Sequence, residues 1–138
     1  MSTTIRPELS ENSKYFITRH RYYELKHFCL QYSYWRKQYV ILSGYSRNPE
    51  LYFHVKHSDI GDPTARIAEE MAFYSCRMDT VKKAAYETDE VLGDYILKAV
   101  TEGLSYEAVK AKLEIPCGRE TYYELYRRFF WLLDKSRG

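Results

Sequence analysis

Five polar residues near the C-terminus have the chemistry and spacing needed to hydrogen-bond to base edges in DNA. They are Arg119, Glu120, Tyr123, Glu124 and Arg127. An arginine can pair bidentately with guanine, a glutamate can accept from cytosine, and a tyrosine can lie on a thymine methyl group or reach a phosphate. Spacings of three and four place these side chains on one side of a helix, which would present them together.

Neighbouring residues would hold the phosphate backbone. Arg128, Lys110 and Lys112 are better placed for phosphates than for bases, and Thr121 completes the candidate DNA-binding set. The ordinary alternative is a solvated helix face on which Glu124 and Arg128 form an i,i+4 ion pair, worth a few tenths of a kcal/mol.

Residues suited to catalysis or metal binding are few. His54 and His57 form an HxxH pair followed by Asp59 and Asp62. Away from a defined helix this spacing is a weak metal signal, and two solvated histidines are favoured. The sequence contains no nucleophile elbow, phosphate-binding glycine loop or CxxC pair. We therefore expect no enzyme, no catalytic residue, no metal and no cofactor.

The three cysteines, Cys29, Cys76 and Cys117, are odd in number and widely spaced. This pattern indicates reduced thiols, not a disulfide framework. Cys117 precedes the last predicted helix, where backbone amides can lower the pKa of a thiol, but a space-filling role is favoured.

A helix–turn–helix pattern positions the candidate residues. Ser105 can cap a short helix that cannot continue past Ile115, because Pro116 disfavours helical geometry in the residue before it. Gly118 then permits a sharp reversal. The second helix has one apolar side: Tyr122, Leu125, Tyr126, Phe129, Leu132 and Leu133. Two helices joined by a short glycine-containing turn can place the second in a DNA major groove, although a hairpin that only closes a core fits the spacing equally well.

Upstream, two long helices are predicted. One runs from about Thr18 to Leu42. A breaker-rich stretch follows at 43–62, with one helical turn expected around Glu50–His54. The second long helix then begins at Asp62-Pro63, an N-cap acid followed by proline in the first helical position. We expect them to pack antiparallel. The matching seams are Leu25, Phe28, Tyr32, Trp35 and Tyr39 against Ile67, Met71, Tyr74, Met78 and Val81.

A third helix, capped by Thr88 or Asp89, should end at Gly103. Its expected inward residues are Val91, Leu92, Tyr95, Ile96 and Val100. The predicted fold class is therefore all-α, with a long N-terminal helical hairpin and a C-terminal helix–turn–helix unit. The predicted segments are a polar leader (1–14), the hairpin (15–88, with the irregular connection 43–62) and the helix–turn–helix unit (89–138).

The C-terminal segment resembles the promoter-reading region four of bacterial sigma factors. Residues that match its pattern are Glu102, Gly103, Ser105, Tyr106, Glu107, Val109, Ile115, Pro116 and Gly118. The whole chain resembles small phage regulators of the RinA and ArpU type, through Thr121, Tyr122, Tyr123, Arg127, Arg128, Phe129 and Phe130. This resemblance implies activation of late-gene transcription. Between Gly118 and Thr121 the chain has about two residues more than the sigma pattern, which shifts individual base-contacting positions by about half a helical turn.

The charge distribution complicates a DNA-binding interpretation. Residues 89–138 contain eight Lys/Arg and nine Asp/Glu, a balance of −1. Because nonspecific affinity scales with the number of phosphates neutralised, this segment alone should bind weakly. Sorting of cations to one face, a homodimer, or binding energy from RNA polymerase would each compensate. A second apolar stripe on the first helix (Tyr23, Leu30, Tyr34 and Ile41) favours a homodimer, unless the C-terminal unit covers it within one chain.

We therefore expect a sequence-specific DNA-binding transcription regulator of phage or prophage origin that acts on double-stranded DNA, and on RNA polymerase as a possible second partner. The alternatives are an adaptor that docks on RNA polymerase or a nuclease, and a small terminase-like packaging protein. With no long apolar run or signal peptide in the sequence, we expect no membrane association and a location in the cytoplasm of a bacterial host cell.

Overall fold

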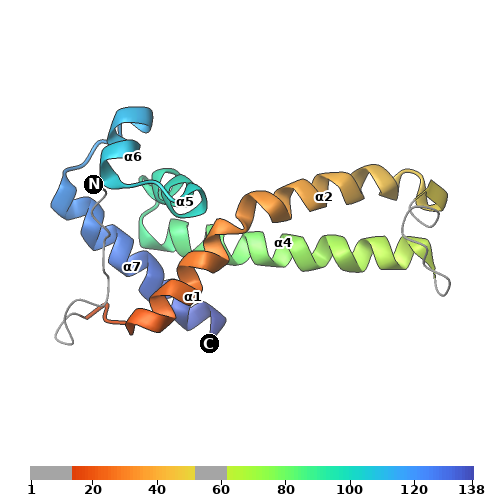
Figure 1. Ribbon diagram of the computed structural model, residues 1–138, viewed down its shortest axis with the longest axis horizontal. Coiled ribbons are helices and arrows are strands. Elements are labelled where there is room, and N and C mark those ends of the chain that lie inside the picture. The colour runs from red at the N-terminus through yellow and green to blue at the C-terminus, as the bar shows by residue number, and fades with distance from the viewer. Residues whose placement is uncertain (1–13, 52–61) are drawn as a thin grey trace. The chain divides into compact units, whose positions relative to one another are not determined.

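The computed structural model describes residues 14–51 and 62–138, which form six α-helices and contain no strand (Figure 1). The predicted all-α class is confirmed. The helices are α1 (Arg19–Leu30), α2 (Tyr32–Ser46), α4 (Pro63–Thr88), α5 (Gly93–Glu102), α6 (Tyr106–Leu113) and α7 (Arg119–Arg137). The expected polar leader (1–14), except Lys14, and most of the expected turn at Glu50–His54 lie outside the described residues.

The chain divides into two compact units. The hairpin unit is Tyr32–Asp79, and the main unit comprises the chain up to Gln31 together with Thr80–Gly138. The division passes through α4, so it differs from the boundary expected between residues 88 and 89. Each unit has buried apolar residues of its own.

The expectation of one continuous helix from Thr18 to Leu42 is wrong. Thr18 does cap the start, since its hydroxyl accepts from the Arg21 amide at 3.3 Å. At Gln31, however, ψ is −4° and the amide bonds to the carbonyl of Phe28, three residues back, which tightens the turn and ends α1. The second segment, α2, then continues beyond the predicted end, to Ser46.

In the hairpin unit, α2 and the first part of α4 run side by side in opposite directions (Figure 1). Leu42 and Ile67 form the buried cluster between them, flanked by Tyr45, Met71 and Tyr74. The start of α4 is as predicted, because the Asp62 carboxylate accepts from the Thr64 amide at 3.0 Å.

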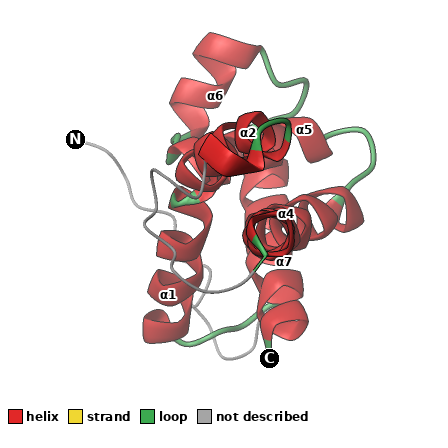
Figure 2. Cartoon of the chain, turned by 90° about the vertical axis from the view of Figure 1, so that its right-hand side faces the viewer, coloured by secondary structure: helices red, strands yellow, loops and turns green. Residues whose placement is uncertain are grey.

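In the main unit, α1 packs against α5 and α7 (Figure 2). Tyr22 is 1% exposed, its hydroxyl lies 2.8 Å from that of Tyr126, and its ring meets the Phe130 ring edge-on at 5.1 Å. The Arg137 guanidinium lies over the Phe28 ring, 3.6 Å from the ring centre. The expected packing of Leu25 and Phe28 as part of the hairpin seam is therefore corrected, because the interruption at Gln31 assigns α1 to the main unit.

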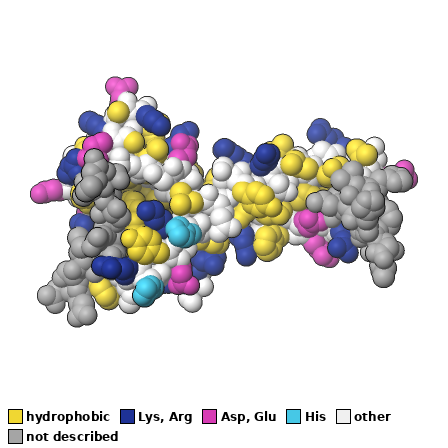
Figure 3. Space-filling model, in the orientation of Figure 1, with side chains coloured by type: hydrophobic (Ala, Val, Ile, Leu, Met, Phe, Trp, Pro, Cys, Tyr) yellow, Lys and Arg dark blue, Asp and Glu magenta, His cyan; other side chains and the backbone are white. Residues whose placement is uncertain are grey.

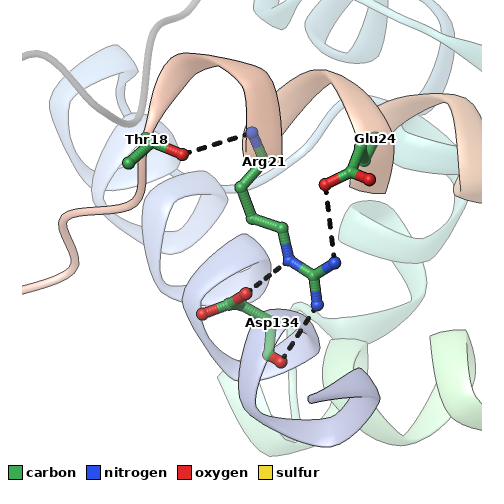
Figure 4. Close-up of polar contacts among 4 residues, drawn as sticks. All are labelled: Thr18, Arg21, Glu24 and Asp134. Atoms are coloured by element: carbon green, nitrogen blue, oxygen red, sulfur yellow. Dashed lines mark hydrogen bonds and ion pairs between the residues drawn. The ribbon is translucent and has the colours of Figure 1, made fainter.

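A polar clamp joins the start of α1 to the end of α7 (Figure 4). Arg21 donates from Nε to a carboxylate oxygen of Asp134 at 2.6 Å and from a terminal nitrogen to the Asp134 carbonyl at 3.5 Å. Its other terminal nitrogen lies 3.6 Å from the Glu24 carboxylate. The hydrogen bond to Asp134 raises the pKa of Arg21. A cation at this position also complements the negative end of the α7 dipole.

The third predicted helix starts later than expected. The Asp89 carboxylate accepts from the amides of Val91 and Leu92 at 2.9 and 2.8 Å, which forms a turn before α5 begins at Gly93. Val91 is consequently 79% exposed, not buried as predicted. Gly103 ends the helix as predicted, with φ at 67° in the left-handed region that glycine adopts without strain.

Candidate nucleic-acid interface

The first helix of the predicted helix–turn–helix forms as expected. The Ser105 hydroxyl accepts from the Ala108 amide at 3.2 Å and caps α6. Val109, on the inner side of α6, is fully buried, and α5 packs against both α6 and α7. The three helices therefore form a small packed unit.

The turn between α6 and α7 reverses at a residue that the sequence analysis did not identify. Glu114, not Gly118, has positive φ (54°), whereas Gly118 is extended and forms the N-cap of α7. Ile115 is fully buried and anchors the turn. Two side chains of α6 close it: the Tyr106 hydroxyl donates to the Cys117 carbonyl at 2.9 Å, and Lys110 Nζ donates to the Ile115 carbonyl at 3.1 Å.

Over its first two turns, the second helix, α7, has one buried side and one side that is exposed or half-buried. Tyr122 and Tyr126 are buried. Arg119, Glu120, Thr121 and Glu124 are exposed, and Tyr123 and Arg127 are half-buried. The structure thus brings six of the predicted DNA-binding residues to the outward side of one helix, where groups that read base edges need to be.

Arg119 is already engaged with neighbouring side chains. One terminal nitrogen donates to the Tyr123 hydroxyl at 2.6 Å, and another forms an ion pair with Glu107. Its guanidinium also lies 5.3 Å from the centre of the Tyr106 ring. Sequence reasoning did not assign Glu107 a role at this surface, because the pairing depends on how α6 and α7 meet.

The remaining cations lie in different surroundings. Arg127 pairs with Glu124 at 3.4 Å in an i,i+3 arrangement, so the ion pair considered between Glu124 and Arg128 is replaced by this one. Arg128 donates to the Glu87 carbonyl at 3.5 Å, and its Nε is buried with no hydrogen-bond partner in the part of the chain that the structure describes. Lys112 is exposed. Of the three cations expected to hold phosphates, Lys110 and Arg128 thus contact backbone carbonyls, whereas Lys112 is exposed to solvent.

A row of aromatic rings packs on the buried side of α7, behind its exposed residues. Tyr122 lies 5.3 Å from Tyr106 and 6.0 Å from Tyr126, measured between ring centres. Burial raises the pKa of both Tyr122 and Tyr126. Among the described residues, the Tyr122 hydroxyl has no hydrogen-bond partner. Packed rings of this kind fix the rotation of α7 and hence which residues point outward.

The sequence favours ordinary roles for the cysteines and histidines over reactive or metal-binding ones. Burial raises the pKa of Cys117, which is opposite to the lowering that a helix N-terminus could produce. Cys29 and Cys117 carry free thiols. Among residues 14–51 and 62–138, no three His, Cys, Asp or Glu side chains gather as metal ligands. His54, His57 and Asp59 lie outside the described residues.

Over the same described part of the chain, no helix has both the length and the apolar character that a membrane crossing requires. No protein-family model, curated protein or solved structure matches this chain.

Proposed function

We propose that the chain is a sequence-specific DNA-binding transcription regulator, of phage or prophage origin as its sequence resemblance implies, and that α7 is its recognition helix. One observation supports this most: the first two turns of α7 bury Tyr122 and Tyr126 and direct Arg119, Glu120 and Glu124 to solvent. A recognition helix needs this division, because its inner face must be held while its N-terminal residues reach base edges.

The ion pairs at this surface add a testable feature. Arg119 would have to exchange Glu107 for a base or phosphate when DNA binds. Exposed ion pairs are worth about 0.2–1 kcal/mol, so the exchange costs little. Glu107→Gln should therefore raise DNA affinity by up to about fivefold, because it releases the guanidinium and removes a charge that repels phosphate.

The direct test is fluorescence anisotropy with labelled duplexes from the gene's own genomic neighbourhood. Arg127→Ala should weaken specific binding by about 1–3 kcal/mol, whereas Lys112→Ala should weaken binding to all duplexes alike and lower the salt slope by about one. Lys112 suits this purpose better than Lys110, whose amine holds the Ile115 carbonyl inside the turn.

A combined variant decides the proposal. Arg119→Ala, Tyr123→Ala and Arg127→Ala together should abolish specific binding. Its matched control is Lys82→Ala with Lys83→Ala, which removes the same positive charge from exposed positions on α4. Unchanged affinity in the combined variant, with its thermal unfolding intact, would refute the assignment.

Such a result would favour a second function, that of an adaptor on RNA polymerase or another large protein. Two observations favour this alternative: residues 89–138 carry a net charge of −1, and both Arg119 and Arg127 are paired with carboxylates. Co-purification of RNA polymerase with the chain, in the absence of any duplex that it retards, would support it.

A further inference from the structure

The hairpin unit exposes an aromatic face that spans both of its helices. Tyr34 of α2 and Phe73 of α4 are 55% and 49% exposed. Half-buried Tyr74 joins them, since its ring centre lies 6.2 Å from that of Tyr34 and 5.2 Å from that of Phe73. Ile41, two turns along α2 from Tyr34, is 41% exposed. We call these four residues the aromatic face; Figure 3 shows hydrophobic side chains gathered over the middle of α2 and α4.

This face follows from the pattern of α2. Trp35 and Leu42, seven residues apart on one side of α2, are 2% and 3% exposed, and Leu42 lies in the buried cluster against α4. Tyr34 and Ile41 each precede one of these residues by one position, so they form a second stripe rotated by about 100° around the helix. Two helices can bury only the apolar stripes that face each other, and a second stripe needs further helices to cover it, as in a four-helix bundle.

The charges around Phe73 indicate what covers the face. Glu70 lies three residues before Phe73 and Arg77 four residues after it, so all three lie on one side of α4. The Arg77 guanidinium lies over the Phe73 ring, 3.9 Å from the ring centre. The order acid, aromatic, base is complementary to itself when reversed: in an antiparallel pair of α4 helices centred beside Phe73, each Glu70 falls opposite the Arg77 of the other helix.

We propose that the aromatic face binds the same face of a second copy of this chain, in an antiparallel arrangement about a two-fold axis beside Phe73. An interface of this kind is isologous, so each contact occurs twice. The two Glu70–Arg77 contacts set the register and the aromatic rings supply the buried area. The pairing stands independently of DNA binding, although a dimer would double the cations available to a duplex.

The test is the mass of the full chain in solution, measured by light scattering at tens of micromolar. The expected result is twice the 16.5 kDa of one chain. Glu70→Arg should place arginines opposite Arg77, and Arg77→Glu should place glutamates opposite Glu70. Each variant alone should therefore weaken the dimer at least tenfold and give a predominantly monomeric mass at low micromolar concentration.

Mixing the two variants provides the discriminating measurement. In a mixed pair, an arginine stands opposite a glutamate at every contact, so the heterodimer should form again. Phe73→Glu should give a folded monomer with the helix content of the parent by circular dichroism, because Phe73 is half exposed within one chain. Val40→Glu, about 100° around α2 from Ile41 and 63% exposed, is the matched control and should remain dimeric.

A parent chain of monomeric mass would overturn the proposal and leave the face to a different protein. An assembly larger than two that persists in all of these variants would also overturn it, as would two single variants that stay monomeric when mixed.

Discussion

The clamp between Arg21 and Asp134 should stabilise the main unit measurably, and a double-mutant cycle can isolate its contribution. Arg21 Nε lies 2.6 Å from the Asp134 carboxylate, and the two side chains are 26% and 35% exposed. At an effective dielectric constant of about 20, the gross attraction is several kcal/mol, but partial exposure screens it and desolvation opposes it. Exposed pairs contribute about 0–1 kcal/mol and charged hydrogen bonds about 1.5–3. We therefore expect a coupling energy of about 1–2 kcal/mol.

The cycle consists of Arg21→Ala, Asp134→Ala and the double variant, unfolded with urea at low micromolar concentration. A Trp35→Phe background leaves Trp131 of α7 as the only tryptophan, so its fluorescence reports on the main unit. The matched control is the exposed pair Lys98–Glu102, with side chains 53% and 47% exposed and a separation of 3.3 Å. Its coupling energy should be about 0.3–0.5 kcal/mol.

Salt separates the two pairs further. In 1 M NaCl the Debye length falls to about 3 Å, so the control coupling should vanish while most of the Arg21–Asp134 coupling persists. A coupling energy for the clamp that equals the control, or that disappears with it in salt, would refute the view that α1 and α7 are held together by this contact.

Three further outcomes are expected. Trp35→Ala should lower the free energy of unfolding by about 3–5 kcal/mol, because Trp35 is 2% exposed; a melt like the parent's, followed by circular dichroism, would contradict this. Glu114→Gly should stabilise the chain by about 0.5–1 kcal/mol in urea unfolding, since φ at this residue is 54° and glycine adopts such geometry without strain; a loss of stability would count against it. Stability should fall above pH 10. Burial raises the pKa of Tyr122 and Tyr126 from the ordinary value of 10.0, so above that pH the unfolded chain loses protons that the folded chain keeps, at up to about 1.4 kcal/mol per pH unit for each tyrosine. The contribution is fully present below pH 10. Tyr122→Phe should reduce the slope at little cost, because the Tyr122 hydroxyl bonds to none of the residues that the structure describes. An unchanged slope would refute the assignment.

Much of the local structure could be predicted because its causes are local. Asp62, Ser105 and Gly103 define helix ends as expected, since a cap depends on hydrogen bonds to residues a few positions away. The buried side of α7 was also predictable, because a period of 3.6 residues assigns each position to a side of the helix.

The interruption at Gln31 was not predictable from such signals. Phe28, Tyr32 and Trp35 continue one apolar stripe through it, and neither glycine nor proline is nearby. The residues before Gln31 and those after it belong to different compact units. Which partner a stripe packs against depends on long-range contacts that periodicity does not encode.

The candidate site divides in the same way. Sequence alone determined that Arg119, Glu120 and Glu124 would face solvent, because their spacing places them opposite the apolar side of α7. Only the tertiary structure decided that Arg119 pairs with Glu107 and that Glu114, not Gly118, takes the left-handed geometry. Both depend on how α6 is positioned against α7. That position is fixed by the burial of Val109, Ile115 and Tyr122, which is a packing requirement of the whole three-helix unit and not of any single segment.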